Sequence, residues 1–161
     1  MQIDAHPSTE QVFRAAEQMP EPRLTAELRR LVVERAHGFC EYCRSQAKFA
    51  TQGFSVEHII AQARGGVTEL QNLACQGCNN HKYDKCEAYD PVSERLVPLY
   101  HPRRDRWDEH FAWSGDYALM VGLTPVGRAT VAALRLNREG VVNLRRVLFA
   151  HGLHPLPADD D

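Results

Sequence analysis

Hydrophobic and polar positions follow a helical period in the first well-patterned stretch of this chain, residues 25–38. Thr25 is a favourable N-cap, and Gly38 is a residue type that commonly ends helices. Charged residues occupy the positions between the apolar ones. The apolar stripe consists of Leu28, Leu31, Val32 and Ala36. This pattern predicts an amphipathic helix that packs on a core through one face.

The next stretch changes to strand-like patterning. Residues 54–61 are rich in β-branched and aromatic residues, and Gly65-Gly66 follows as a turn signal. Residues 70–74 are able to pair back as a second strand, and residues 78–87 predict a helix. The expected order is strand, loop, strand and helix.

Beyond Asp90-Pro91 the pattern predicts short strands over 96–100, 107–113 and 117–123. Thr124-Pro125 is a strong helix start, so helices are expected over 124–136 and 140–150. The whole pattern predicts an α+β fold. We expect an amino-terminal extension over 1–22, a core over 23–88, and a carboxy-terminal α/β extension with an acidic tail over 89–161. Ser8 and Gln11 form a capping-box pattern, which predicts a short helix over 9–19.

Composition is ordinary for a soluble globular protein, with 43% hydrophobic and 25% charged residues. No apolar run is long enough to span a bilayer, and the amino terminus lacks the pattern of a signal peptide. We therefore expect a cytoplasmic protein without a membrane partner.

Basic residues are distributed unevenly. The formal net charge is −2, but residues 22–158 hold 18 of the 19 Lys and Arg and only 14 of the 21 acids, a net of about +4. Local clusters at 103–106 and 135–146 suit phosphate contacts, although any single Arg is equally well explained as part of a solvated face.

Four of the five cysteines form two Cys-x-x-Cys pairs separated by 31 residues. Two matched pairs without a signal peptide indicate metal coordination rather than disulfides. A closed site with four thiolates, Cys40, Cys43, Cys75 and Cys78, predicts structural zinc. The alternative is a set of thiols unrelated to metal. Cys86 is left over and is expected to be a small apolar residue.

His58 lies near the centre of the first predicted strand. A neutral imidazole is able to take a proton from water near pH 7, although a lone histidine on a strand is more often structural. The residues around His58 in the sequence favour a catalytic role over a structural one.

Residues 40–82 resemble the HNH (ββα-metal) endonuclease family in a set of short motifs. The set comprises Cys-x-x-Cys, Glu57-His58-Ile, Gly-Gly, Asn72-Leu, Cys-x-x-Cys-Asn79 and a Lys. The resemblance implies that His58 is the general base, that Asn72 orients it, and that Asn79 and Glu57 bind a catalytic divalent metal. It also implies hydrolysis of DNA that leaves 5′-phosphate and 3′-hydroxyl ends. Oxygen ligands suit Mg²⁺ or a similar hard ion.

Two departures bear on this interpretation. Only two residues separate Asn72 from Cys75, where comparable family members have about four. Glu57 and His58 are adjacent, so on a regular strand they point to opposite faces.

Four residues are candidates for contact with nucleic acid. Lys82, three residues beyond Asn79, is expected to meet a phosphate. His81 would lie about 200° around the helix from Asn79 and is assigned a DNA contact or a structural role. Arg103 and Arg104 belong to the first basic cluster. Residues 93–150 resemble the carboxy-terminal extension of a group of bacterial HNH proteins, which supplies no function for them.

The leading hypothesis is a metal-dependent HNH endonuclease acting on DNA, with RNA left open. The alternatives are a zinc-dependent nucleic-acid-binding module with weak or no cleavage, and a structural zinc domain that mediates protein contacts. The target sequence, nicking or double-strand cleavage, the pathway and the oligomeric state are open.

Overall fold

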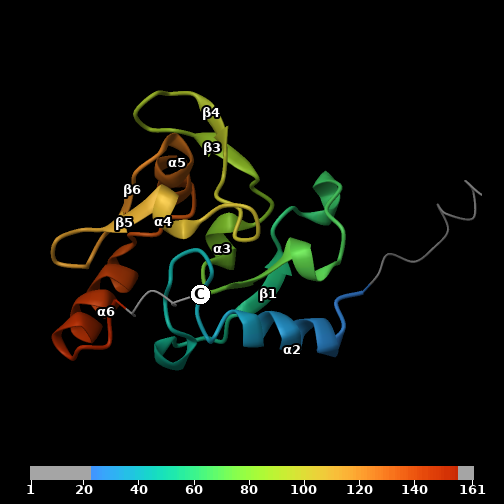
Figure 1. Ribbon diagram of the computed structural model, residues 1–161, viewed down its shortest axis with the longest axis horizontal. Coiled ribbons are helices and arrows are strands. Elements are labelled where there is room, and N and C mark those ends of the chain that lie inside the picture. Colours follow the sequence, from blue (N-terminus) through green and yellow to red (C-terminus); the bar gives the residue numbers. More distant parts are fainter. Residues whose placement is uncertain (1–22, 156–161) are drawn as a thin grey trace, which may run out of the picture.

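The computed structural model describes residues 23–155, which contain three two-stranded antiparallel sheets with helices beside them (Figure 1). The predicted α+β class is confirmed. The helix predicted over 9–19 lies outside the described residues. Within residues 23–155, no helix is both long and apolar enough to cross a membrane.

A ββα unit follows the first helix, α2 (Ala26–Arg35). Strands β1 (Ser55–His58) and β2 (Leu73–Gln76) pair antiparallel with His58 opposite Leu73, and α3 (Asn79–Lys82) begins three residues after β2 ends. Helix α2 packs on one face of the hairpin. The buried residues of this contact are Val32, Ala36, Val56, Leu73 and Cys75. The predicted order of strand, loop, strand and helix is confirmed.

Helix α3 is shorter than the sequence suggests. It ends at Lys82, because Tyr83 takes a left-handed backbone conformation with φ of 48° that cannot continue a right-handed helix. The residues after it are mostly polar and offer no apolar stripe, and helices in proteins depend on such a stripe for stability. The predicted end at Glu87 is therefore wrong, and Glu87 instead begins a strand.

The carboxy-terminal part contains two more hairpins and two longer helices. Strands β3 (Glu87–Tyr89) and β4 (Leu96–Pro98) pair, as do β5 (Phe111–Trp113) and β6 (Met120–Gly122). Helices α5 (Pro125–Ala133) and α6 (Glu139–Ala150) follow, with Thr124 capping α5 through its hydroxyl.

The strand predicted over 107–113 is wrong in its first half, which forms the short helix α4 (Trp107–His110). Asp108 and Glu109 lie in the first turn, where the helix dipole favours acidic groups. Arg106 forms ion pairs with both of them. Aromatic spacing suggested a strand, but this local electrostatic arrangement favours a helical turn.

One hydrophobic cluster joins the ββα unit to the carboxy-terminal part. It contains Cys40, Tyr42 and Cys78 together with Leu99, Phe111 and Leu134. The boundary predicted after residue 88 falls inside β3. Asp90, fully buried, accepts two hydrogen bonds of 2.8 Å from the Arg128 guanidinium and so ties the β3–β4 hairpin to α5.

Candidate functional site

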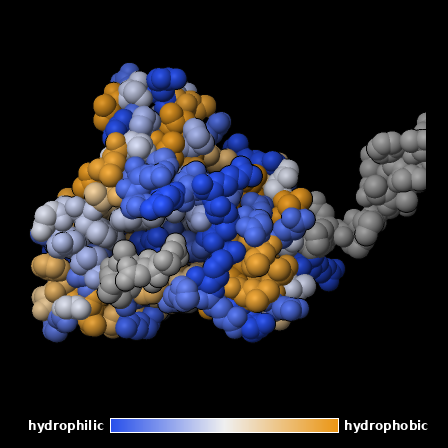
Figure 2. All heavy atoms as spheres, viewed as in Figure 1, coloured by the Kyte–Doolittle hydropathy of each residue, from blue (hydrophilic) through white to orange (hydrophobic). Residues whose placement is uncertain are grey.

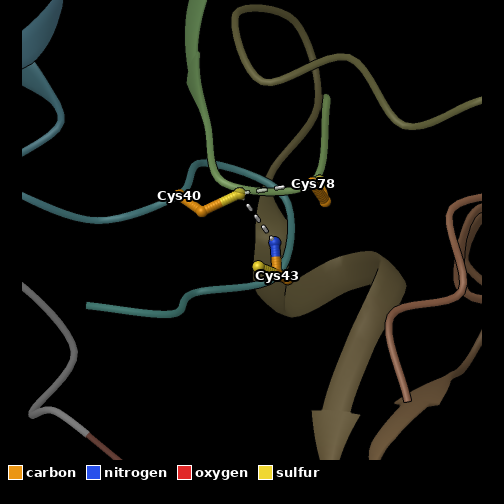
Figure 3. A group of neighbouring side chains, drawn as sticks. All are labelled: Cys40, Cys43 and Cys78. Atoms are coloured by element: carbon orange, nitrogen blue, oxygen red, sulfur yellow. Dashed lines mark hydrogen bonds between the residues drawn. The ribbon is translucent and has the colours of Figure 1, made fainter. Parts of the chain in front are cut away.

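Three cysteines converge beside α3. The sulfurs of Cys40, Cys43 and Cys78 lie within 4.8 Å of one another, and all three residues are buried (Figure 3). Cys40 and Cys43 come from the tight turn after α2, and Cys78 is the N-cap of α3. Cys43 donates its backbone N–H to the Cys40 sulfur at 3.5 Å, a contact that holds the turn closed.

The spacing of these sulfurs suits a tetrahedral metal. Cys40 Sγ and Cys78 Sγ are 3.6 Å apart, and a Zn–S bond of about 2.3 Å in tetrahedral geometry separates sulfurs by about 3.8 Å. Burial raises the pKa of Cys40 to about 12. Hydrogen bonding to Cys40 and Cys78 lowers the pKa of Cys43. The neighbouring thiols thus stabilise negative charge on Cys43, and a divalent cation bound here would replace thiol protons.

Cys75 does not join this group. It faces α2 within the hydrophobic cluster of Val32 and Val56, because alternation along β2 sends Cys75 and Leu73 to the same face. The structure therefore brings together three of the four predicted thiolates. The pKa of Cys75 is raised by burial and by the nearby charge of Cys43.

Glu41, inside the first cysteine knuckle, connects the two knuckles. Its carboxylate accepts a 2.7 Å hydrogen bond from the backbone N–H of Cys75, and its own N–H donates to the Cys75 carbonyl at 2.9 Å. The guanidinium of Arg103 pairs with the same carboxylate, and that of Arg35 lies 3.8 Å away. No local sequence pattern indicates the role of Glu41, because that role depends on a partner 34 residues away.

His58, at the end of β1, is half-buried, and its Nε2 lies 2.9 Å from the hydroxyl of Thr68. Thr68 is buried in the β1–β2 loop and also accepts a 3.2 Å hydrogen bond from the Gln62 amide. The loop thus fixes the imidazole ring. The sequence gives no signal for this contact, because Thr68 lies ten positions after His58.

Asn72 holds the same loop in place. Its Oδ1 accepts from the Ile60 N–H, while its Nδ2 donates to the Ile60 and Val67 carbonyls, all at 2.9 Å. Within residues 23–155, these hydrogen bonds of the Asn72 side chain all go to backbone groups, so its hold on His58 is exerted through the loop backbone. Gly66 also belongs here, since a Cβ at this position would collide with the Ile60 carbonyl.

Glu57 and Asn79 are both half-buried. Val56 packs against α2, and side chains alternate along a paired strand, so Glu57 projects to the face of β1 away from α2. Asn79 is the first residue of α3. The ring of His58 turns to Thr68 in the loop. The opposite directions expected for adjacent strand residues are found.

Lys82 is buried, so its ammonium group is not accessible to a phosphate. Its side chain is 1% exposed, and its ammonium donates to the carbonyls of Ile59 at 2.7 Å and His58 at 3.3 Å. The assignment of Lys82 to nucleic acid is therefore corrected. The long side chain reaches inward because the carbonyls at the end of β1 need a donor.

The other predicted contact residues separate into two groups. Arg103 is only 15% exposed in its side chain and pairs with Glu41, so it too serves the interior, and its assignment is corrected. Arg104 is exposed. His81 is half-exposed, and burial lowers its pKa, with the charges of Arg138, Arg135 and Lys85 acting in the same direction.

The fold and the cysteine cluster together define a ββα unit organised around a knuckle with three buried thiols that could hold a metal ion. Residues 40–89 match the family described as HNH endonuclease, which confirms the resemblance seen in the motifs. No curated protein and no solved structure shows significant similarity to the chain.

Proposed function

We propose that this protein is a metal-dependent endonuclease that hydrolyses phosphodiester bonds in DNA, with His58 as the general base. The carrying observation is the match of residues 40–89 to HNH endonucleases, combined with a half-exposed His58 at the end of β1 in a ββα unit. The cellular location proposed is the cytoplasm.

The chemistry begins at the imidazole of His58. We infer the tautomer in which Nε2–H donates to Thr68, since this leaves a lone pair on Nδ1. That nitrogen takes a proton from water, the water oxygen attacks phosphorus, and the bond to the 3′ oxygen breaks. The products are 5′-phosphate and 3′-hydroxyl ends. General base catalysis of this kind contributes about 10²- to 10⁴-fold in rate.

The proposal involves two metal ions, one structural and one catalytic. Structural zinc would be held by Cys40, Cys43 and Cys78, with Cys75 as the fourth ligand after rotation of its side chain. Carboxylate and amide oxygens at Glu57 and Asn79 suit Mg²⁺ or a similar ion, which would neutralise charge on the phosphate and the leaving oxygen.

A basic surface beside α3 supports nucleic-acid binding. Its members are His81, Lys85, Arg135 and Arg138. None of the ion pairs found within residues 23–155 involves Lys85, Arg135 or Arg138. Figure 2 shows hydrophilic residues over the middle of this face, around α3, with apolar residues to either side. Cations without carboxylate partners are available to phosphates.

The test is cleavage of supercoiled plasmid DNA by wild type, His58→Ala and Asn80→Ala in Mg²⁺ or Mn²⁺. Wild type and the exposed-residue control Asn80→Ala should nick the plasmid, and His58→Ala should lose at least about 100-fold in rate. Equal cleavage by all three proteins would contradict the assignment of His58.

A binding module without cleavage is the second candidate, favoured by the opposite directions of Glu57 and His58 on β1 and by the short Asn72–Cys75 segment. DNA retention at low salt without nicking in any divalent metal would establish it in place of the nuclease.

A further inference from the structure

Arg145, on α6, is buried although it carries a charge. The residue is 3% exposed, and its guanidinium stands over the Trp113 ring at 4.9 Å from the centroid. Its Nη1 donates to the Ala118 carbonyl at 3.2 Å and to the Asn137 side-chain oxygen at 3.0 Å. Its Nη2 reaches the Cys43 carbonyl at 3.1 Å, across 102 residues of sequence.

All of these partners are neutral. The ion pairs found within residues 23–155 do not include Arg145. Carbonyl oxygens satisfy the N–H donors of a guanidinium, but they do not balance its charge, and an unbalanced buried charge is costly. A guanidinium stays protonated in proteins near neutral pH, so the charge of Arg145 has to be balanced by its surroundings.

The cysteine cluster is the source of negative charge that could balance the charge of Arg145. Arg145 contacts the backbone of Cys43, whose sulfur lies in the group formed with Cys40 and Cys78. Three thiolates around one divalent cation carry a net charge of −1, and four carry −2. A fixed cation beside such a cluster offsets this charge, in the way that outer-shell groups tune metal sites.

A second contact shows that the carboxy-terminal segment is seated on this knuckle. Gln46, buried just after the first cysteine pair, donates its amide N–H to the Leu153 carbonyl at 2.7 Å. The middle of α6 and the segment that follows the helix are therefore both tied to the first cysteine knuckle and the residues just after it, and the position of Arg145 is not the result of a single flexible side chain.

We propose that Arg145 supplies the positive charge that stabilises a metal ion bound in the cysteine knuckle, so that α6 forms part of the metal site. The proposal rests on the structural metal of the proposed function and not on catalysis. It assigns a role to the carboxy-terminal extension, which the HNH match over residues 40–89 does not cover.

The test is zinc affinity of the full chain, measured by competition with a chromophoric chelator. Arg145→Met removes the charge and keeps the length of the side chain, and Arg145→Lys keeps the charge. Arg146→Met, at an exposed position on the same helix, is the matched control. We expect Arg145→Met to bind zinc about 10- to 100-fold more weakly, and Arg146→Met to match wild type.

A merely structural role gives a different result. Because folding and metal binding are coupled, it weakens zinc binding only through lost stability, so Arg145→Met loses no more zinc affinity than Leu148→Ala, a buried apolar truncation on the same helix, and that result overturns the proposal. If Arg145→Met does not fold, Arg145→Lys carries the test. Affinity within about threefold of wild type supports the charge assignment, and a folded Arg145→Lys that loses tenfold or more contradicts it.

Failure of the two proposals is distinguishable. A wild-type chain that binds no zinc overturns the metal site and this proposal together, while plasmid nicking still tests His58 separately. Wild type and all variants binding zinc equally overturns only the role of Arg145.

Discussion

The side chain of Asn72 forms hydrogen bonds with both the backbone N–H and the backbone carbonyl of Ile60. Its side-chain oxygen accepts from the Ile60 N–H and its nitrogen donates to the Ile60 carbonyl, each at 2.9 Å. The loop that carries Thr68 is thereby fixed to the end of β1, where His58 lies. A buried amide with three backbone partners therefore determines where the candidate base points.

Asn72→Ala is expected to lower the free energy of unfolding by about 2–4 kcal/mol, because backbone groups at residues 60 and 67 lose their partners. Urea unfolding of the zinc-loaded chain measures this loss. Asn80→Ala, an exposed change on α3, serves as the control and should stay within about 0.5 kcal/mol. A loss below 0.5 kcal/mol in Asn72→Ala would contradict the role of this side chain.

Thr68→Val keeps the shape of the side chain and removes the hydroxyl that meets His58 Nε2. We expect the nicking rate to fall by about 10- to 100-fold, part of what a general base supplies, while DNA binding is unchanged. Thr68→Ser restores the hydroxyl and should recover most of the rate. Equal rates for the Val and Ser variants would show that the hydroxyl does not orient His58.

The pH dependence of stability should contain a contribution from Asp90. Hydrogen bonds from Arg128 hold the pKa of this carboxyl well below its usual range, so its contribution is present above the unfolded pKa of about 3.9 and is lost as the pH falls below it. Asp90→Asn is expected to flatten the loss of stability between about pH 5 and pH 2.

Thermal midpoints of wild type and Asp90→Asn across this range provide the measurement. Acid also releases metal from thiolates, but both proteins share that loss, so the difference between the two curves isolates Asp90. Parallel curves would show that the Asp90–Arg128 pair contributes nothing to acid sensitivity.

Metal content tests the cysteine cluster. Purified wild type should hold one zinc per chain, and Cys40→Ser should lose it and unfold, since metal binding and folding are coupled in such knuckles. Cys86→Ser, outside the cluster, is the control.

Cys75→Ser then decides the fourth ligand. Loss of zinc shows that Cys75 rotates out of the α2 cluster to coordinate, and retention of zinc shows a site of three thiolates completed by another group. The absorption of the cobalt-substituted chain reports the number of thiolates directly.

Replacing both Arg135 and Arg138 by Gln should weaken DNA binding for all sequences alike. Each phosphate contact contributes about 0.9 to the slope of log K against log salt, so the slope should decrease by up to about 2. Arg29→Gln, exposed on α2, is the control and should leave the slope unchanged. An unchanged slope in the double variant would exclude the basic surface beside α3 as a phosphate contact.

Local spacing in the sequence determined much of this protein. The cysteine pairs, the Gly65-Gly66 turn, and the positions of His58 and Asn72 each act over a few residues, and they identified the ββα unit and its HNH character. The first half of the strand predicted over 107–113 and the carboxy-terminal half of the helix predicted over 78–87 were wrong. Aromatic and polar residues there satisfy two patterns, and local charge and packing select between them.

Only the tertiary structure decided which cations face solvent and which face the interior. Lys82, Arg103 and Arg145 look like basic surface residues in the sequence, yet each is directed to buried carbonyls or to a buried carboxylate. The same holds for Cys75, directed to α2, and for Thr68, brought to His58. Long-range packing sets these directions, because a side chain turns toward whatever partner the fold brings near it, and that partner lies tens of residues away along the chain.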